Sequence, residues 1–195
     1  MEKNSPQSHQ GHKEIPKHEI QNEYPILIVG IGNTYRSDDA VGLCVAQHLK
    51  RQAFDHVNVI EESGDGVILM DSWKDSAAVI LIDAVHSGAQ PGTIHRFDVH
   101  TQTIPTKFFH YSTHAFGVAE AIELARALKQ LPKNLIVYGI EGKCFDAGIG
   151  LSWEVEKAVE EVMKRVQQDI LSAAKPQPKC LKCKMSKVTK VNGLL

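Results

Sequence analysis

Five acidic residues and one histidine stand at positions where they could do chemistry together. They are Asp38, Asp39, Asp65, Asp83, Glu141 and His114. Each acid follows an apolar segment that is typical of a strand, and His114 opens a segment with helical periodicity. Carboxylate oxygens and a neutral imidazole nitrogen form a donor set that could hold nickel, zinc, iron or manganese, with open positions for a substrate. Composition alone does not choose the metal.

Some of these carboxylates also have structural explanations. Asp38 and Asp39 fall in the first turn of an expected helix, where negative charge is stabilised by about 0.3–1 kcal/mol. Asp65 lies between two glycines before another expected helix, so turn and cap chemistry could explain it. Asp83 ends a buried apolar strand with no helix for it to cap, and a carboxylate there is costly without a partner. We therefore expect Asp39 and Asp83 to be functional, with Asp38, Asp65 and Glu141 as secondary candidates.

His114 has two interpretations. At a helix N-terminus the dipole disfavours the charged imidazolium, and the neutral ring is the form that ligates metal. The alternative is a histidine that hydrogen-bonds a neighbouring loop. Grouped with Asp39 and Asp83, it would give one nitrogen and two or more oxygens.

Strand and helix patterns alternate along the chain and must position these residues. Strands are expected at 26–31, 57–61, 77–82, 93–97 and 135–140, the fourth at an edge. Helices are expected to begin at Ser37, to run through Leu69 and Trp73, and to cover residues 113–130. A last helix is expected after a cap at Ser152, with its inner face formed by Val155, Val159, Val162 and Val166. Residues 98–112 are expected to form a surface loop. This alternation predicts an α/β fold, a three-layer αβα sandwich around a mostly parallel, roughly five-stranded sheet. Ligands of such sheets bind beyond the carboxyl ends of the strands.

The composition is that of a folded globular chain, with 43% hydrophobic and 23% charged residues among 195. The net charge of −1 combines +6 for a lysine-rich tail at 175–195, −1 for a polar extension at 1–24, and −6 for the domain at 25–174. We expect both ends to be disordered and nucleic acid not to be a partner. The start lacks the apolar stretch of a signal peptide, and no run is long enough to span a bilayer, so we expect a cytoplasmic location.

Other motifs in the chain are weaker. The cysteines fit a reducing compartment, and the pair Cys180 and Cys183 is interpreted as ordinary tail thiols or a metal or redox site. The N-terminal histidines His9, His12 and His18 fit a solvated tail or weak metal binding. Gly30-Ile31-Gly32 lacks the third glycine of a dinucleotide fingerprint, and two aspartates open the next helix. Neither a GxSxG elbow nor a P-loop is present, so conventional nucleophilic catalysis is not indicated.

Six short motifs, in this order and spacing, resemble one known family. They are Ile28-Val29-Gly30-Ile31-Gly32-Asn33, Asp38-Asp39-Ala40-Val41-Gly42, Ile82-Asp83-Ala84-Val85 with Pro91-Gly92-Thr93, Ser112-Thr113-His114, Gly139-Ile140-Glu141 and Gly150-Leu151-Ser152. Over about residues 25 to 172 the chain is similar to the hydrogenase maturation endopeptidases. Two positions depart from the usual pattern: Gly142-Lys143 and Trp153 stand where relatives often have proline, which bears on substrate fit.

The resemblance implies a function and a site. Such enzymes cut the C-terminal extension from the large-subunit precursor of a nickel–iron hydrogenase, just after its last nickel-binding cysteine motif, once nickel has been inserted. The family's metal-contacting positions fall on Asp39, Asp83 and His114, so the nickel would come with the substrate. A carboxylate would be the natural general base, unassigned here. The family has also been classed with aspartic endopeptidases.

Two other functions share parts of this evidence. A metal-binding docking or chaperone protein for a maturing metalloenzyme would use Asp39, Asp83 and His114 without cutting its partner. A nucleotide-binding α/β protein would need a complete glycine fingerprint, which the sequence lacks.

Overall fold

The computed structural model describes residues 26–105, 108 and 116–173. The expectations for the two ends, including their disorder and the pair Cys180 and Cys183, lie outside the described residues. The domain bounds expected at 25–174 stay a prediction.

A single five-stranded sheet forms the centre of the fold. Its strands are β1 Ile26–Ile31, β2 Val57–Glu62, β3 Ala78–Val85, β4 Ile94–Asp98 and β5 Asn134–Glu141. Their order is β2-β1-β3-β5-β4, and only β4, at the edge, runs antiparallel to its neighbour. The carboxyl ends of β2, β1, β3 and β5 therefore meet at one edge of the sheet, which we call the carboxyl edge.

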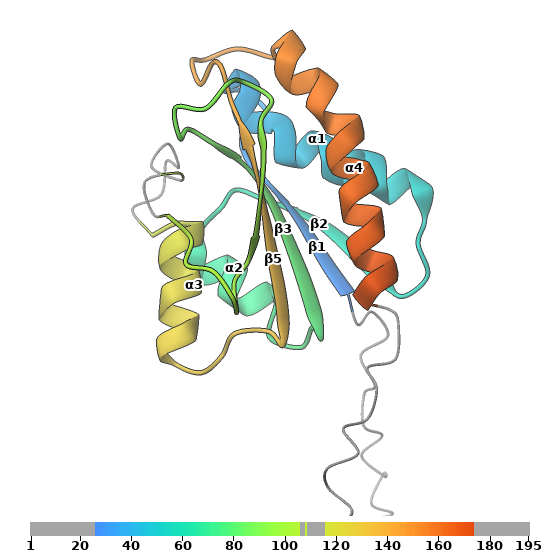
Figure 1. The fold of residues 1–195 in the computed structure, drawn as a ribbon, viewed down its shortest axis with the longest axis vertical. Coiled ribbons are helices and arrows are strands. Elements are labelled where there is room, and N and C mark those ends of the chain that lie inside the picture. The colour runs from blue at the N-terminus through green and yellow to red at the C-terminus, as the bar shows by residue number, and fades with distance from the viewer. Residues whose placement is uncertain (1–25, 106–107, 109–115, 174–195) are drawn as a thin grey trace, which may run out of the picture.

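Helices cover both faces of this sheet. They are the 3-10 helix η1 Ser37–Ala40, then α1 Val41–Gln52, α2 Gly66–Ser72, α3 Val118–Ala127 and α4 Trp153–Ala173. Figure 1 shows α1 and α4 on one face, with α2 and α3 on the other. Alternate strand residues feed two separate cores: Ile26 and Ile28 pack towards α1 and α4, whereas Leu27 and Val29 pack towards α2 and α3. The three-layer αβα prediction is confirmed. Within the described ranges, no helix is both long and apolar enough to cross a membrane.

Two predictions about local structure were wrong. The helix expected over 113–130 is shorter, because Gly117 is extended and its N–H bonds to the Glu120 carboxylate, and because Lys129 adopts a φ of 57°. Residues 113–115 lie outside the described residues. The stretch after β4 is more than a surface loop, since Val99 and Ile104 are buried against α2 and α3. Isolated apolar residues such as Val99 and Ile104 show no helical or strand periodicity. The sequence pattern therefore did not predict that they are buried.

Small residues let α1 lie directly on the sheet. A Cβ on Gly42 would lie 2.2 Å from the carbonyl oxygen of Ile82 and 2.3 Å from that of Ile31. A Cβ on Gly30 would lie 2.5 Å from Cβ of Ala46. Any larger side chain at Gly30 or Gly42 would push the helix outward. This close approach holds η1, which carries Asp38 and Asp39, against the carboxyl ends of β1 and β3.

Candidate active site

Asp83 is a buried carboxyl at the carboxyl edge. It lies in β3, and only 6% of its surface is exposed. The N–H of Ala84 donates to Oδ1 over 2.8 Å. Burial raises the pKa of Asp83 to about 8, and the negative charge of Asp39 acts in the same direction. Asp83 is therefore a carboxyl group that holds its proton at neutral pH in the metal-free protein.

Asp39 lies close enough to Asp83 for the two charges to interact. Burial raises the pKa of Asp39, while the charge of Arg36 and a hydrogen bond from the backbone of Asn33 act in the opposite direction. The turn before η1 fixes its position. Gly32 has a φ of 147°, and a Cβ there would lie 1.8 Å from the carbonyl oxygen of Asp39. Only glycine fits this turn, and the turn brings Asp39 to the end of β1.

Asp38, in contrast, is wholly occupied by hydrogen bonds to a distant loop. Its side chain is fully buried and accepts from the N–H groups of Lys143 (2.8 Å), Cys144 (2.9 Å) and Ser152 (2.6 Å). The hydroxyl of Ser152 donates a fourth bond over 2.9 Å. The sequence offered helix capping as an explanation for Asp38. The Asp38 side chain makes no hydrogen bond that caps η1, so this explanation is not borne out. Asp38 instead ties the connection between β5 and α4 to η1, and we call this set of four bonds the Asp38 clip.

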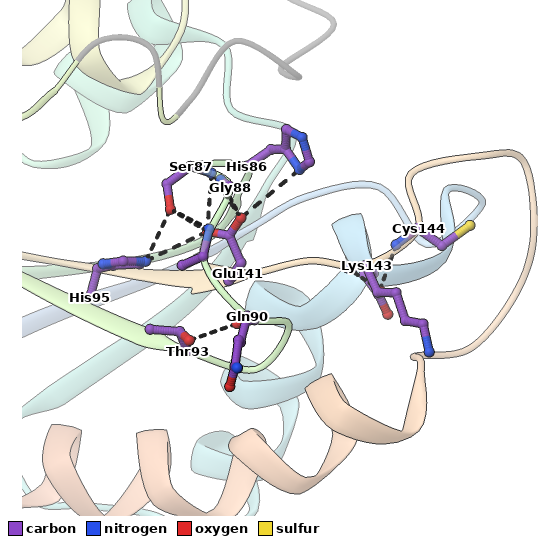
Figure 2. Close-up of polar contacts among 11 residues, drawn as sticks. His86, Ser87, Gly88, Gln90, Thr93, His95, Glu141, Lys143 and Cys144 are labelled. Carbon is purple, nitrogen blue, oxygen red and sulfur yellow. Dashed lines mark hydrogen bonds and ion pairs between the residues drawn. The ribbon is translucent and has the colours of Figure 1, made fainter.

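Glu141 fills a similar role for the connection between β3 and β4 (Figure 2). Its carboxylate is 1% exposed and accepts from the N–H groups of Ser87 and Gly88, each at 2.9 Å, and from the Ser87 hydroxyl at 2.7 Å. Nε2 of His95 lies 3.5 Å from it, and Nδ1 of His86 lies 4.0 Å from it. These contacts hold the loop directly after Asp83 in place. Ser87 and His95 were missed from the sequence, although Ser87 stands only four residues beyond Asp83.

Asp65 has the structural role that its neighbours indicated. Its carboxylate is the N-cap of α2 and accepts from the N–H groups of Val67 (2.9 Å) and Ile68 (3.1 Å). Such a cap is worth about 1 kcal/mol. The helix-capping explanation of Asp65 is confirmed.

His114 lies outside the described residues. A neutral His114 ring was expected from a helix dipole at that position. Helix α3 begins only at Val118, so this reason for a neutral ring no longer holds. Among the residues that the structure describes, no three His, Cys, Asp or Glu side chains group as a metal site. Asp39 and Asp83 would thus need a further ligand from elsewhere, and the role of His114 stays a prediction.

Comparisons with known proteins identify the family of this site. The family model described as hydrogenase maturation protease matches residues 43–169. The chain is 33% identical over 155 residues to a provisionally named hydrogenase maturation protease of Methanocaldococcus jannaschii, covering 74% of this chain and 96% of that protein. The chain belongs to the hydrogenase maturation protease family.

A further relative and a solved structure are also similar to this chain. The hydrogenase 2 maturation protease of Escherichia coli K12 is 26% identical over 145 residues, covering 72% of this chain and 87% of that one. The solved structure of the hydrogenase maturating endopeptidase HybD from E. coli superposes with a TM-score of 0.64 at 24% identity, over 76% of this chain and 93% of that chain. That likeness shows the fold. Family membership makes this protein an endopeptidase, a hydrolase of hydrogenase maturation.

In a maturation protease, the carboxyl pair has two useful properties. Two acids whose charges interact, one buried and one partly buried, resist carrying two negative charges, so a positive charge delivered to them is favoured. A carboxyl with a pKa near neutrality can also accept and return a proton. Asp39 and Asp83 together can receive a positive charge, and Asp83 can exchange a proton, whereas Asp38, Glu141 and Asp65 hold loops and a helix.

The raised pKa of Asp83 predicts how stability depends on pH. Because the folded protein binds this proton more tightly than the unfolded chain, the carboxyl contributes stability that is fully present below about pH 4 and lost as the pH rises to about 8. Asp83→Asn removes this dependence. We expect the metal-free variant to gain stability relative to the wild type by about 1 kcal/mol per pH unit between about pH 5 and pH 7. Urea unfolding measures the difference, and a difference that is constant with pH contradicts the prediction.

Proposed function

We propose that this protein removes the C-terminal extension from the nickel-loaded large-subunit precursor of a nickel–iron hydrogenase and so completes its maturation. The observation that carries the proposal is the carboxyl pair: Asp39 and Asp83 lie together at the carboxyl edge of a maturation-protease fold, and burial raises the pKa of both. Of the other candidate carboxylates, Asp38, Asp65 and Glu141 are engaged with backbone N–H groups. The pair is thus the part of the candidate set that can receive a cation.

The nickel belongs to the substrate in this proposal. Nickel held by the precursor's cysteine thiolates gains Asp39, Asp83 and His114 as further contacts when the precursor docks. The positive charge offsets the cost of ionising two carboxyls whose charges interact, one buried and one partly buried, and Asp83 releases its proton on docking. A precursor without nickel meets a protonated Asp83 and gains none of these metal contacts, so it docks poorly. The metal status of the substrate is thereby a condition for cleavage.

The same contacts serve the chemistry. Substrate-held nickel can polarise the scissile carbonyl or acidify a water molecule, with cleavage just after the last nickel-binding cysteine motif. A carboxylate of the pair takes the proton of the attacking water and returns it to the leaving amine. The proposal assigns the role of general base to the pair and not to one member of it. The aspartic-type classification stays a prediction. The cytoplasmic location expected from the sequence stays a prediction.

Intact-mass measurement of the precursor tests this function. We expect the purified protein to remove the extension from nickel-loaded precursor and to leave nickel-free precursor whole. Loss of the extension regardless of nickel contradicts the metal requirement. A stable complex with unchanged mass overturns the proteolytic function in favour of a docking or chaperone protein.

A further inference from the structure

Three large apolar side chains lie exposed on the connections next to Asp39. Tyr35, between β1 and η1, is 71% exposed, and Ile149, between β5 and α4, is 88% exposed. Trp153, the first residue of α4, is 64% exposed. We call these three residues the apolar rim. Exposed apolar groups are common singly, but two on joined loops and a third at the start of the next helix, beside a candidate active site, indicate a binding surface.

Backbone hydrogen bonds join the two loops of the apolar rim. The N–H of Gly148 donates to the carbonyl of Tyr35 over 3.0 Å, and the N–H of Ser37 donates to the carbonyl of Gly148 over 3.1 Å. Arg36 and Gly148 thus form a short parallel bridge. The Asp38 clip fixes the same loop again at Ser152, the residue before Trp153. The surface is therefore formed before a partner arrives, which reduces the entropy lost on binding.

The composition of the apolar rim fits a protein partner. Tyrosine and tryptophan are enriched among the side chains that carry most of the binding energy of protein interfaces. Polar groups surround them: Nζ of Lys157 lies 3.6 Å from the centroid of the Trp153 ring, and Lys143 pairs with Glu154 over 2.7 Å. Apolar side chains inside a charged border are typical of such interfaces.

We propose that the apolar rim docks apolar side chains of the hydrogenase large-subunit precursor beside its cleavage segment. The inference rests on the proposed function, because that function requires a protein substrate to reach Asp39 and Asp83. Tyr35 stands four residues before Asp39, and Arg36 stands three residues before it. The positive charge of Arg36 lowers the pKa of Asp39. A substrate that reaches Asp39 therefore comes close to the rim at Tyr35. A second copy of this chain seated there would block the same approach, so the precursor is the occupant.

The test compares a rim variant with a matched control. The triple variant Tyr35→Ser, Ile149→Ser and Trp153→Gln removes the apolar surface and keeps polar side chains there. The control is Leu128→Ser with Leu171→Ser, which removes two leucines that are 53% and 65% exposed outside the rim. Because all five residues are exposed, we expect melting temperatures close to that of the wild type. Biolayer interferometry gives the Kd for nickel-loaded precursor, and cleavage assays give KM and kcat.

We expect the Kd of the rim variant to rise at least about tenfold, with the loss of kcat/KM carried by KM, while the control matches the wild type. An unchanged Kd overturns the docking proposal, even if the wild type cleaves the precursor. Loss of self-association in sedimentation, with an unchanged Kd, assigns the rim to a second copy and also overturns it. A wild type that binds through the rim but never cleaves supports the docking surface and overturns the proteolytic function alone.

Discussion

Asp39→Asn is expected to slow cleavage of the nickel-loaded precursor by at least about a hundredfold. The amide keeps the volume of the side chain but removes the negative charge that a cation would meet, and substitutions around metal sites cost about 10- to 100-fold even when they only orient a ligand. The same change removes the charge that acts on Asp83. Initial rates from intact mass, at saturating precursor, measure the effect.

The matched control is Asp71→Asn, on the last turn of α2. Asp71 is an exposed carboxylate whose side chain pairs with Lys74, and its side chain is 76% exposed. We expect the control to cleave at the wild-type rate. An Asp39→Asn protein that also cleaves at that rate refutes the assignment of Asp39 to the site.

Asp38→Ala is expected to lower the free energy of unfolding by about 3–5 kcal/mol. The change leaves three backbone N–H groups, of Lys143, Cys144 and Ser152, without their acceptor. A donor left unpaired costs about 1–3 kcal/mol when buried and less in this part-buried loop, and the lost carboxylate, which is fully buried, leaves a cavity. Urea unfolding followed by far-ultraviolet circular dichroism measures the loss as a shift of the midpoint at constant slope.

Asp55→Ala is the control for this measurement, because Asp55 is exposed in the connection before β2. We expect it to change the free energy of unfolding by no more than about 0.5 kcal/mol. A loss below about 1 kcal/mol for Asp38→Ala would show that water or a rearranged loop satisfies the freed N–H groups. The Asp38 clip would then not be what fixes the apolar rim.

The fold was largely predictable because its signals are local. The run Ile28-Val29 and the run Leu81-Ile82 are buried on both faces of the sheet, and such strands are continuously apolar. Helix α4 presents a regular stripe that includes Val155 and Val162, and both are fully buried. The ends of α3 were mispredicted, since they depend on the conformations of Gly117 and Lys129, which the hydrophobic period does not report.

The site was predictable only in part, because its decisive contacts are far apart in the chain. Asp38 and Asp39 are neighbours with the same side chain, yet one accepts a hydrogen bond from Ser152, 114 residues away, and the charge of the other acts on Asp83. The sequence ranked Asp39 above Asp38 as a candidate, but it did not show which tertiary contacts each one makes. Asp83 could be singled out, since a carboxyl that ends an apolar strand with no helix to cap needs another explanation. Glu141 was recognised as an edge carboxylate, whereas its engagement with Ser87 and Gly88 depends on a tertiary contact.

The dependence of cleavage on nickel occupancy tests the central claim most directly. Precursor samples that range from nickel-free to fully loaded would be incubated with excess protein, and the cleaved fraction would be read from intact masses. The account predicts that the cleaved fraction equals the fraction of precursor that carries nickel, with the nickel-free sample left whole. Complete cleavage of the nickel-free sample, or no cleavage of the fully loaded sample, would contradict it.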